Sequence, residues 1–362
     1  MPRPPESHVS TSTRLQYVSH TSLRICRVRK GGGFVYVKGG QRLRKAAVIK
    51  RLTSLVIPPA WNEVRICSNP HGHLQATGRD ARGRRQYLYH SEWRRIRDEQ
   101  KFKHMLSFAR ALPKIRRRVR HDLRPRELTK TKVLAAVVRL LELSCIRVGN
   151  EEYARSNHSF GLTTLRDRHV RISGEKIQFH FFGKSGKEHS VTLSDARLAR
   201  VVGRCQDIPG QMLFQYLDEE GRRRKIESGD VNAYLREISE GDFTAKDFRT
   251  WIATVQMVAA LDALPRFHSK ASALRNVNAA VQSVATRMGN TPTICRKCYV
   301  HPGIIDAYIA GQNLRIFGGT KGSETVVLRL LRPRGRLNNT ALPRKPTAGI
   351  RGGSSGRGKA RT

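Results

Sequence analysis

The sequence is poor in acidic residues, with 28 Asp and Glu against 69 Lys and Arg among its 362 residues. Metal-dependent nucleases gather carboxylates around magnesium, and no D-x-D or D-x-x-E cluster stands near the basic motifs of this chain. We therefore expect no metal centre. The sequence also lacks a run approaching the roughly 18 apolar residues of a membrane span, and its first residues, M-P-R-P-P-E-S-H, include no apolar stretch for secretion. These absences predict a cytoplasmic protein with no membrane partner.

Cysteine is scattered along the chain, which argues against a disulfide framework. The six cysteines are Cys26, Cys67, Cys145, Cys205, Cys295 and Cys298. The last two form a single C-x-x-C, but no second pair or H-x-H partner stands at zinc spacing. We expect reduced thiols, and we expect Cys295 and Cys298 to pack the helix that presents Tyr299.

Positive charge is the dominant feature of what is present. The formal net charge is +41, and basic residues occur in nearly every block of ten. Charge of this size indicates a polyanionic partner, most simply nucleic acid. Its spread along the chain fits a protein that surrounds its ligand better than one with a single basic face. Charge alone fits a ribosomal or histone-like protein as well as it fits an enzyme.

Four separated motifs carry residues that together can break a phosphodiester without a metal ion. They are Arg147 in C-I-R-V-G-N, Lys184 in F-F-G-K-S-G-K, Arg249 in K-D-F-R-T-W and Tyr299 in N-T-P-T-I-C-R-K-C-Y. Arginine grips non-bridging oxygens in a bidentate fork, while lysine can protonate a leaving oxygen and tyrosine can attack phosphorus. Taken singly, each has a plainer interpretation, as an arginine on the DNA backbone or a packing tyrosine. The set as a whole indicates the reaction.

The turn that contains Lys184 is flanked by glycines and is predicted to be a hairpin loop, from which a side chain can enter a groove. Lys187 competes for the same role, and residue type alone barely separates the two lysines. The string G-K-S-G-K is not a phosphate-binding P-loop, because Glu188 stands where that motif requires Ser or Thr.

The motifs, in this order, resemble the small, poxvirus-type DNA topoisomerases of class IB in the form found in bacteria. The resemblance spans roughly residues 14 to 325 and includes V-I-P-P-A-W-N-E-V at 56 to 64 and G-H-L-Q-A-T-G-R-D-A-R-G-R-R-Q-Y-L-Y-H at 72 to 90. It implies that Tyr299 is the nucleophile, that Arg147 and Arg249 hold the scissile phosphate, and that Lys184 is the general acid. It further implies relaxation of supercoiled DNA through a 3′-phosphotyrosyl intermediate, without ATP, metal or other cofactor.

Asn290 departs from the poxvirus pattern, which has histidine nine residues before the tyrosine. Bacterial members of the family tolerate asparagine here. Because an amide does not titrate, we assign Asn290 to transition-state stabilisation through a hydrogen bond to a non-bridging oxygen.

Further DNA contacts are implied by the same resemblance. Gln86, Tyr87 and Tyr89 in R-Q-Y-L-Y-H match family residues that touch DNA in the major groove, where glutamine can read adenine. Tyr87 and Tyr89 share one face of a predicted strand, so a half-buried aromatic pair is an equally good interpretation. Tyr153 resembles another base contact, and Lys187 is assigned to DNA binding.

The hydrophobic pattern and the resemblance together predict an α+β fold in four segments. Residues 1–13 form a disordered N-terminus, 14–97 a small β-rich DNA-binding domain, 98–331 a larger, mostly helical catalytic domain, and 332–362 a basic disordered tail. We expect a helix from about Ser91 to Arg118, with the basic segment around Pro113 to His121 as the bridge between domains. We expect a monomer that clamps double-stranded DNA, in association with the nucleoid.

Local patterns place the motif residues on predicted elements. An amphipathic helix containing Val133 and Val137 is predicted to deliver Arg147 at its end, and a strand meander is predicted over 168–195. Thr244 and Asp247 form a capping box for the helix that carries Arg249 on its first turn. A further helix is predicted from an apolar stripe and the C-cap Gly289. The stripe consists of Leu274, Val277, Val281, Val284 and Met288.

Thr291 and Pro292 then suit the N-cap and first position of the short helix that leads to Tyr299.

Two other functions fit parts of the pattern. A tyrosine recombinase uses similar chemistry on the same catalytic fold, but usually shows H-x-x-R where this chain has Lys246-Asp-Phe-Arg249. It would also need strand exchange within a tetramer. A non-catalytic, basic DNA-coating protein accounts for the charge but not for the order of the motifs.

Overall fold

The computed structural model describes residues 15–312, 314–316 and 318–332. The predicted disordered N-terminus, 1–13, and the predicted tail from residue 333 onward lie outside these residues.

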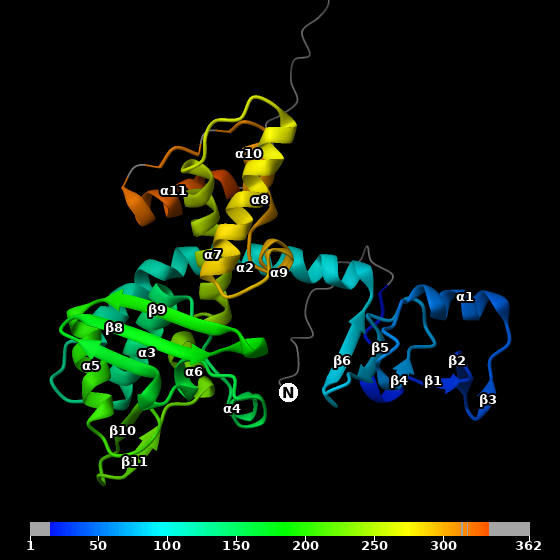
Figure 1. The fold of residues 1–362 in the computed structure, drawn as a ribbon, viewed down its shortest axis with the longest axis horizontal. Helices are drawn as coiled ribbons and strands as arrows, with labels where there is room; N and C mark the ends of the chain where they lie inside the picture. The colour runs from blue at the N-terminus through cyan, green and yellow to red at the C-terminus, as the bar shows by residue number, and fades with distance from the viewer. Residues whose placement is uncertain (1–14, 313, 317, 333–362) are drawn as a thin grey trace, which may run out of the picture.

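The N-terminal lobe is built on a six-stranded antiparallel sheet, seen in blue in Figure 1. The strands, in the order β3-β2-β1-β4-β5-β6 across the sheet, are β3 (Gln41–Arg42), β2 (Gly33–Lys38), β1 (Ile25–Lys30), β4 (Asn62–Ile66), β5 (Leu74–Arg79) and β6 (Arg85–Tyr89). The segment predicted to be β-rich therefore contains six antiparallel strands. The 3-10 turn η1 (His20–Ser22) and helix α1 (Ala46–Ser54), which was not predicted, complete the lobe. Leu52 of α1 packs with Ile25 and Ile66 of the sheet in a small core.

The long helix α2 (Ser91–Asp122) follows β6 and runs into the second lobe (Figure 1). The helix was predicted, but the bridge at Pro113 to His121 was placed wrongly. Ile115 and Val119, in that segment, are buried in the core of the second lobe. Apolar side chains four residues apart lie on one helix face and pack inward. The connecting part of α2 is its N-terminal portion, 91–101, in which no residue is buried.

The second lobe contains nine more helices within the described residues, two small antiparallel sheets and three 3-10 turns. The helices are α3 (Lys130–Ser144), α4 (Glu151–Asn157), α5 (Ala196–Gln206), α6 (Ser228–Ser239), α7 (Ala245–Asp262), α8 (Lys270–Arg287), α9 (Pro292–Cys298), α10 (Pro302–Ile309) and α11 (Gly319–Leu331). The sheets are β7 (Val170–Ser173), β8 (Lys176–Phe182) and β9 (Glu188–Ser194), and β10 (Gln215–Leu217) with β11 (Arg223–Lys225). The turns are η2 (Leu162–Thr164), η3 (Asp167–His169) and η4 (Lys184–Gly186). No helix in the described part of the chain is long and apolar enough to cross a membrane.

The local predictions for this lobe are mostly confirmed. In β8, Ile177, Phe179 and Phe181 are buried and alternate with exposed residues, as a strand with one covered face requires. Helix α3 differs from its amphipathic prediction, because ten of its residues are buried and it runs through the interior. In the predicted stripe of α8, Val277, Val281, Val284 and Met288 are buried, whereas Leu274 is 37% exposed.

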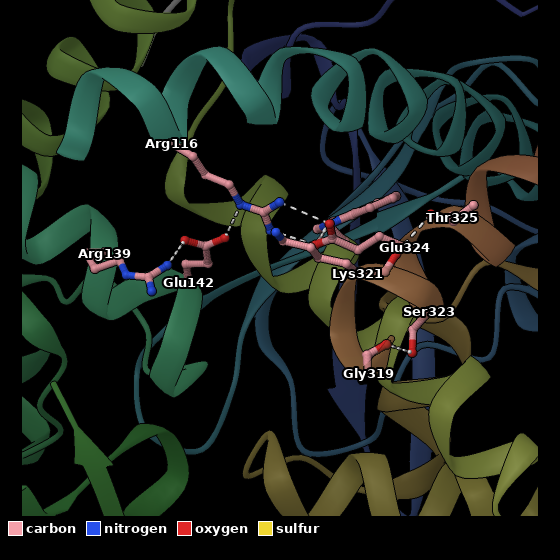
Figure 2. A network of polar contacts seen from close by, with 9 residues as sticks. Arg116, Arg139, Glu142, Gly319, Lys321, Ser323, Glu324 and Thr325 are labelled. Carbon is pink, nitrogen blue, oxygen red and sulfur yellow. Dashed lines mark hydrogen bonds and ion pairs between the residues drawn. The ribbon is translucent and has the colours of Figure 1, made fainter. Parts of the chain in front are cut away.

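A polar network fastens α11 to α2, α3 and α7 (Figure 2). The Arg116 guanidinium donates hydrogen bonds of 2.6 and 3.0 Å to Glu324 and one of 2.5 Å to Glu142. Glu142 also accepts from Arg139 at 2.7 Å, and Trp251 Nε1 donates to Glu324 at 3.3 Å. Burial lowers the pKa of Arg116, but the two carboxylates outweigh it and raise the pKa above its ordinary value.

Candidate active site

Helix α7 places Arg249 in the interior of the second lobe. Its predicted capping box is present, since Asp247 Oδ2 accepts from the Thr244 backbone N–H at 2.8 Å and from the Thr244 hydroxyl at 3.0 Å. Arg249 is the fifth residue of the helix, so it lies just beyond the predicted first turn. Only 4% of Arg249 is exposed to solvent. A buried guanidinium needs polar partners, because its charge cannot be removed by deprotonation.

Those partners are the ends of two other helices. Arg249 donates from Nη1 to the Cys145 carbonyl, and from Nη2 to the Met288 carbonyl at 3.1 Å. Cys145 is the C-cap of α3 and Met288 is the C-cap of α8. The last carbonyls of a helix have no partner within it, so Arg249 satisfies both and ties the two helix ends together.

Each of these helix ends leads directly into a predicted site residue. After α8, Gly289 adopts the left-handed conformation with φ 61° and donates to Thr286 O at 3.1 Å. Asn290 N–H donates to Ala285 O at 2.9 Å, which completes a Schellman motif. Gly289 therefore ends the helix as predicted, as the left-handed residue directly after the C-cap Met288. After α3, Arg147 donates from Nη2 to Asn290 Oδ1 at 2.8 Å. Burial lowers the pKa of Arg147, and the neighbouring charge of Arg249 lowers it further.

Helix α9 begins as predicted, with the Thr291 hydroxyl accepting from Ile294 N–H and Pro292 in the first turn. Cys295 is fully buried in the core, which confirms its predicted packing role, and Cys298 is half-buried.

Tyr299 caps α9 and lies beside the two arginines. The Arg249 Cζ atom is 5.1 Å from the centroid of the Tyr299 ring, within the range of a cation–π contact. The hydroxyl of Thr254, also on α7, donates to the Tyr299 carbonyl at 3.2 Å. Lys101, at the end of the connecting part of α2, donates to the Cys298 carbonyl at 3.2 Å. The position of Tyr299 is therefore set by both α7 and α2.

The cluster of Arg147, Arg249, Asn290 and Tyr299 retains unused hydrogen-bond donors. Arg249 Nε and Asn290 Nδ2 are buried and have no hydrogen-bond partner among the described residues. Within the same residues, neither arginine of the cluster forms an ion pair with a carboxylate. Buried donors without partners are uncommon in native structures. Two guanidinium groups and an amide, with N–H groups to spare beside a phenol, make a site suited to an oxyanion or a phosphate.

Lys184 lies at the turn between β8 and β9, as predicted. The turn is closed by a hydrogen bond of 2.7 Å from Gly183 N–H to the Lys187 carbonyl, and Ser185 takes a left-handed conformation. The side chain of Lys184 is exposed, and within the described residues no hydrogen bond joins it to the arginine cluster. Lys187 is half-buried at the start of the returning strand. Both lysines therefore lie on one turn, and their described contacts do not distinguish which of them is the general acid.

His189, on β9, lies in this region but was not among the residues predicted from the sequence. A methyl group added at Gly289 would lie only 2.3 Å from His189 Cε1, and one added at Gly183 only 2.6 Å from Cδ2 and Nε2. The imidazole therefore fills the space between these two glycines, and it stacks on Phe181 with ring centroids 5.1 Å apart. Burial lowers the pKa of His189, and the charges of Arg147, Arg249 and Lys187 lower it further. Its alternation with Val191 along β9 is the only sequence signal of an inward side chain.

Four of the predicted DNA contacts lie on elements that contribute nothing to the cluster, namely β6 and α4. Gln86, Tyr87 and Tyr89 are on β6 of the N-terminal lobe, where Gln86 donates to Asp80 Oδ2 at 2.9 Å. Tyr87 and Tyr89 are half-buried, with stacked rings whose centroids are 6.3 Å apart, which matches the aromatic-pair interpretation. Tyr153 lies on α4 and is 53% exposed.

No group of three or more His, Cys, Asp or Glu in the described part of the chain is arranged to hold a metal ion.

Two family descriptions match separate parts of the chain. Residues 90–312 match the family described as "Eukaryotic DNA topoisomerase I, catalytic core", and residues 33–80 match "Bacterial DNA topoisomerase IB, N-terminal domain". The first match includes every residue of the Arg249 cluster.

Similar proteins are found in viruses and in yeast. A protein named DNA topoisomerase 1B from Acanthamoeba polyphaga mimivirus is 31% identical over 267 residues, which cover 72% of this chain and 80% of that protein. DNA topoisomerase 1B from Vaccinia virus (strain Copenhagen) is 23% identical over 275 residues, which cover 73% and 80%. DNA topoisomerase 1 from Schizosaccharomyces pombe is 26% identical over 176 residues, which cover 47% of this chain and 20% of that protein.

Proposed function

Because this chain belongs to the type IB DNA topoisomerases and is an enzyme of that kind, we propose that the Arg249 cluster is its active site and that Tyr299 is its nucleophile. One observation carries the proposal. Segments far apart in the sequence place Arg249 against the Tyr299 ring, with Arg147 bonded to Asn290. These are the groups that a metal-free attack on a phosphodiester needs.

In the proposed reaction, the Tyr299 oxygen attacks the scissile phosphorus and the bond from phosphorus to the 5′ oxygen breaks. A 3′-phosphotyrosyl ester and a free 5′-hydroxyl result. Arg147, Arg249 and Asn290 donate hydrogen bonds to the non-bridging oxygens, on which negative charge gathers in the transition state. The broken strand rotates about the intact one, and the hydroxyl then reverses the attack. Since the ester conserves the energy of the original bond, no ATP is required.

Lys184 supplies the proton for the leaving 5′ oxygen in this proposal. The support is its place on an exposed turn whose base, Gly183, meets the Gly289 segment through His189. Lys187, on the same turn, is the alternative acid and is otherwise a DNA contact.

Around this site we propose a monomer that clamps double-stranded DNA between an N-terminal domain, 14–97, and a catalytic domain, 98–331. The net charge of +41 and the exposed connecting part of α2 support the clamp. Gln86, Tyr87 and Tyr89 would contact the duplex from one lobe, and Tyr153 from the other. The proposed location is the cytoplasm, in association with the nucleoid.

Relaxation of a supercoiled plasmid in EDTA, without ATP, tests the proposal. Wild-type protein is expected to relax both positive and negative supercoils, and Tyr299→Phe is expected to relax neither while still binding DNA. A folded, DNA-bound wild-type protein that left the plasmid supercoiled would overturn the proposal and favour a coating protein. Recombinant products would point to a tyrosine recombinase.

A further inference from the structure

The side chain of His189 lies between two turns that begin 106 residues apart in the sequence, at Gly183 and Gly289. Gly183 begins the turn that carries Lys184, and Gly289 begins the turn that carries Asn290. The His189 ring lies so close to both glycines that neither position has room for a side-chain carbon, with approaches of 2.6 and 2.3 Å. Real Cβ atoms essentially never come this close to another atom, so a side chain at either position would have to displace the imidazole.

The ring is also held from its own strand. Phe181, on the neighbouring strand β8, pairs directly with His189 across the hairpin and stacks on it at an interplanar angle of 6°. Phe181 is itself buried in the core of the lobe. His189 is therefore held in place by a buried residue of the core, and it packs in turn against both glycine turns.

The electrostatics of the ring suit this location. His189 lies within the influence of Arg147, Arg249 and Lys187, and these charges together with burial keep its pKa below the ordinary value. The imidazole is therefore neutral at physiological pH. A neutral ring can sit between the turn of Lys184 and the arginines without adding another positive charge to the cluster, which a lysine or arginine at this position would do.

We propose that His189 is a positioning residue, whose imidazole seats the Lys184 turn against the Gly289–Asn290 turn and so sets the reach of Lys184 to the leaving oxygen. The inference rests on the proposed function, in which Lys184 protonates that oxygen. Without the ring, the hairpin loses its contact with the Asn290 turn, and the lysine is no longer held over the scissile bond. Arg147, Arg249 and Asn290 keep their own hydrogen bonds.

A substrate that needs no proton separates this role from a general structural one. Single-turnover cleavage is measured with full-length protein on a duplex containing one target phosphodiester, and on the same duplex with sulfur in place of the leaving 5′ oxygen. A thiolate leaves without protonation, so loss of the acid matters only for the oxygen substrate. His189→Ala is expected to cleave the oxygen substrate at least tenfold more slowly than wild type and the sulfur substrate within about threefold of wild type. Lys184→Ala should show the same pattern with a larger loss.

Equal losses on the two substrates would overturn the inference, because His189 would then serve the phosphate site or the fold as a whole. Wild-type rates on both would overturn it as well. His180→Ala is the matched control, since His180 lies on the other strand of the same hairpin and is exposed, and among the described residues its ring bonds Glu188, at 2.6 Å. This control is expected to cleave both substrates at the wild-type rate.

A second variant tests the contact without removing the histidine. Gly183→Ala adds the methyl group that collides with the ring, and the φ of Gly183 (−98°) accepts alanine. Alone, it is expected to slow cleavage of the oxygen substrate at least fivefold, whereas in the His189→Ala background it should add less than a twofold loss, because the collision is gone. Additive losses in the double variant would contradict the inference. If His189→Ala fails to fold by circular dichroism, Gly183→Ala alone decides the matter, because it should slow the oxygen substrate at least fivefold and the sulfur substrate by less than about twofold, and equal losses on the two would overturn the inference.

Covalent adduct formation by the wild-type protein distinguishes failure of this inference from failure of the proposed function. If wild-type protein forms no covalent adduct with either substrate, the proposed function itself fails. If wild type forms the adduct and His189→Ala cleaves the oxygen substrate equally fast, only the role of His189 fails.

Discussion

Arg249 makes its structural contacts with the same guanidinium that the proposed reaction uses. Its two Nη atoms bond the carbonyls that end α3 and α8, while its Nε is buried without a partner in the described residues. Arg147 differs, since its side chain bonds other residues of the cluster, namely Asn290 at 2.8 Å and Tyr299. The two arginines should therefore respond differently to substitution.

Arg249→Ala is expected to abolish relaxation and to lower the free energy of unfolding by about 2–4 kcal/mol, because two buried helix-end carbonyls lose their donor. Arg147→Ala should abolish relaxation while lowering the free energy of unfolding by less than about 1 kcal/mol. Urea denaturation of the two variants measures the difference, alongside the plasmid assay. Equal destabilisation by the two substitutions would contradict the assigned role of Arg249 as a tie between helices.

The sequence allowed the residues of the cluster to be selected, but not their contacts. Arg147, Arg249 and Tyr299 stand in motifs whose residue types suit phosphoryl transfer. Nothing local shows that Arg249 is buried or that it caps two helices, since both depend on how α3, α7 and α8 pack. His189 could not be predicted for the same reason, because its position is defined by contacts with two glycines that are distant in sequence.

At the scale of elements, the end of α2 is joined to α6 through a buried carboxylate. Asp122 accepts hydrogen bonds from the Tyr234 hydroxyl at 2.8 Å and from Arg118 Nε at 2.9 Å. Burial raises the pKa of Asp122, but hydrogen bonds from His121, Tyr234 and Arg118 outweigh burial and lower its pKa below the ordinary value. Because the folded pKa is lowered, the stabilisation is present at neutral pH and is lost as acid protonates the carboxylate.

Asp122→Asn is accordingly expected to be less stable than wild type by about 1–3 kcal/mol at pH 7. The difference in free energy of unfolding between wild type and Asp122→Asn should narrow as the pH falls below about 4, the ordinary range of a carboxyl pKa. Urea midpoints measured at pH 7 and at pH 3 test this. Asp207→Asn, at an exposed position with no described ion pair, serves as the control and should match wild type at both pH values. A gap for Asp122→Asn that is constant with pH would contradict the account.

The attachment of α11 depends on a second, largely buried carboxylate, that of Glu324, which accepts from Arg116 of α2 (Figure 2). It also accepts from Trp251 Nε1 of α7. Glu324→Ala is expected to lower the free energy of unfolding by about 3–5 kcal/mol, because it leaves a largely buried guanidinium with only one carboxylate. Glu220→Ala removes an exposed partner of Arg222 and should change stability by less than about 1 kcal/mol. Chemical denaturation compares the two. A loss from Glu324→Ala no larger than that from Glu220→Ala would show that the network does not hold α11.

Element types were largely predictable, and the errors have physical causes. Thr291-Pro292 and the Thr244–Asp247 box marked helix starts because capping is local chemistry. The basic segment from Pro113 to His121 was expected to bridge the domains, yet Ile115 and Val119 within it pack into the core of the second lobe. Burial of a helix is decided by packing of its apolar face, which the surrounding basic residues obscured in the sequence.

At the scale of the whole molecule, 69 basic residues against 28 acidic ones should make DNA binding strongly dependent on salt. Each phosphate that the protein neutralises releases condensed counterions. A plot of log Kd against log salt concentration for a labelled duplex is expected to have a slope steeper than about 5, which corresponds to roughly six or more phosphates. A slope near 2 would mean that the protein touches DNA at one small patch and does not surround it. Tyr299→Phe should give the same slope as wild type, since the phenol is not a cation.

In the proposed clamp, the two lobes contribute different parts. The N-terminal lobe offers β6, while the second lobe holds the cluster, and the exposed part of α2 joins them (Figure 1). Lys101, at the end of that connecting part, bonds the carbonyl just before Tyr299. Movement of α2 on closing around a duplex would therefore act directly on the nucleophile.

The most direct measurement is to locate the nucleotide on protein trapped in the act of cleavage. Wild-type protein is mixed with duplex DNA in EDTA, denatured with detergent, digested, and its modified peptide sequenced by mass spectrometry. The account predicts one adduct, a nucleotide esterified through its 3′ phosphate to Tyr299. A nucleotide on any other side chain, or an adduct that forms only when divalent metal is restored, would contradict it.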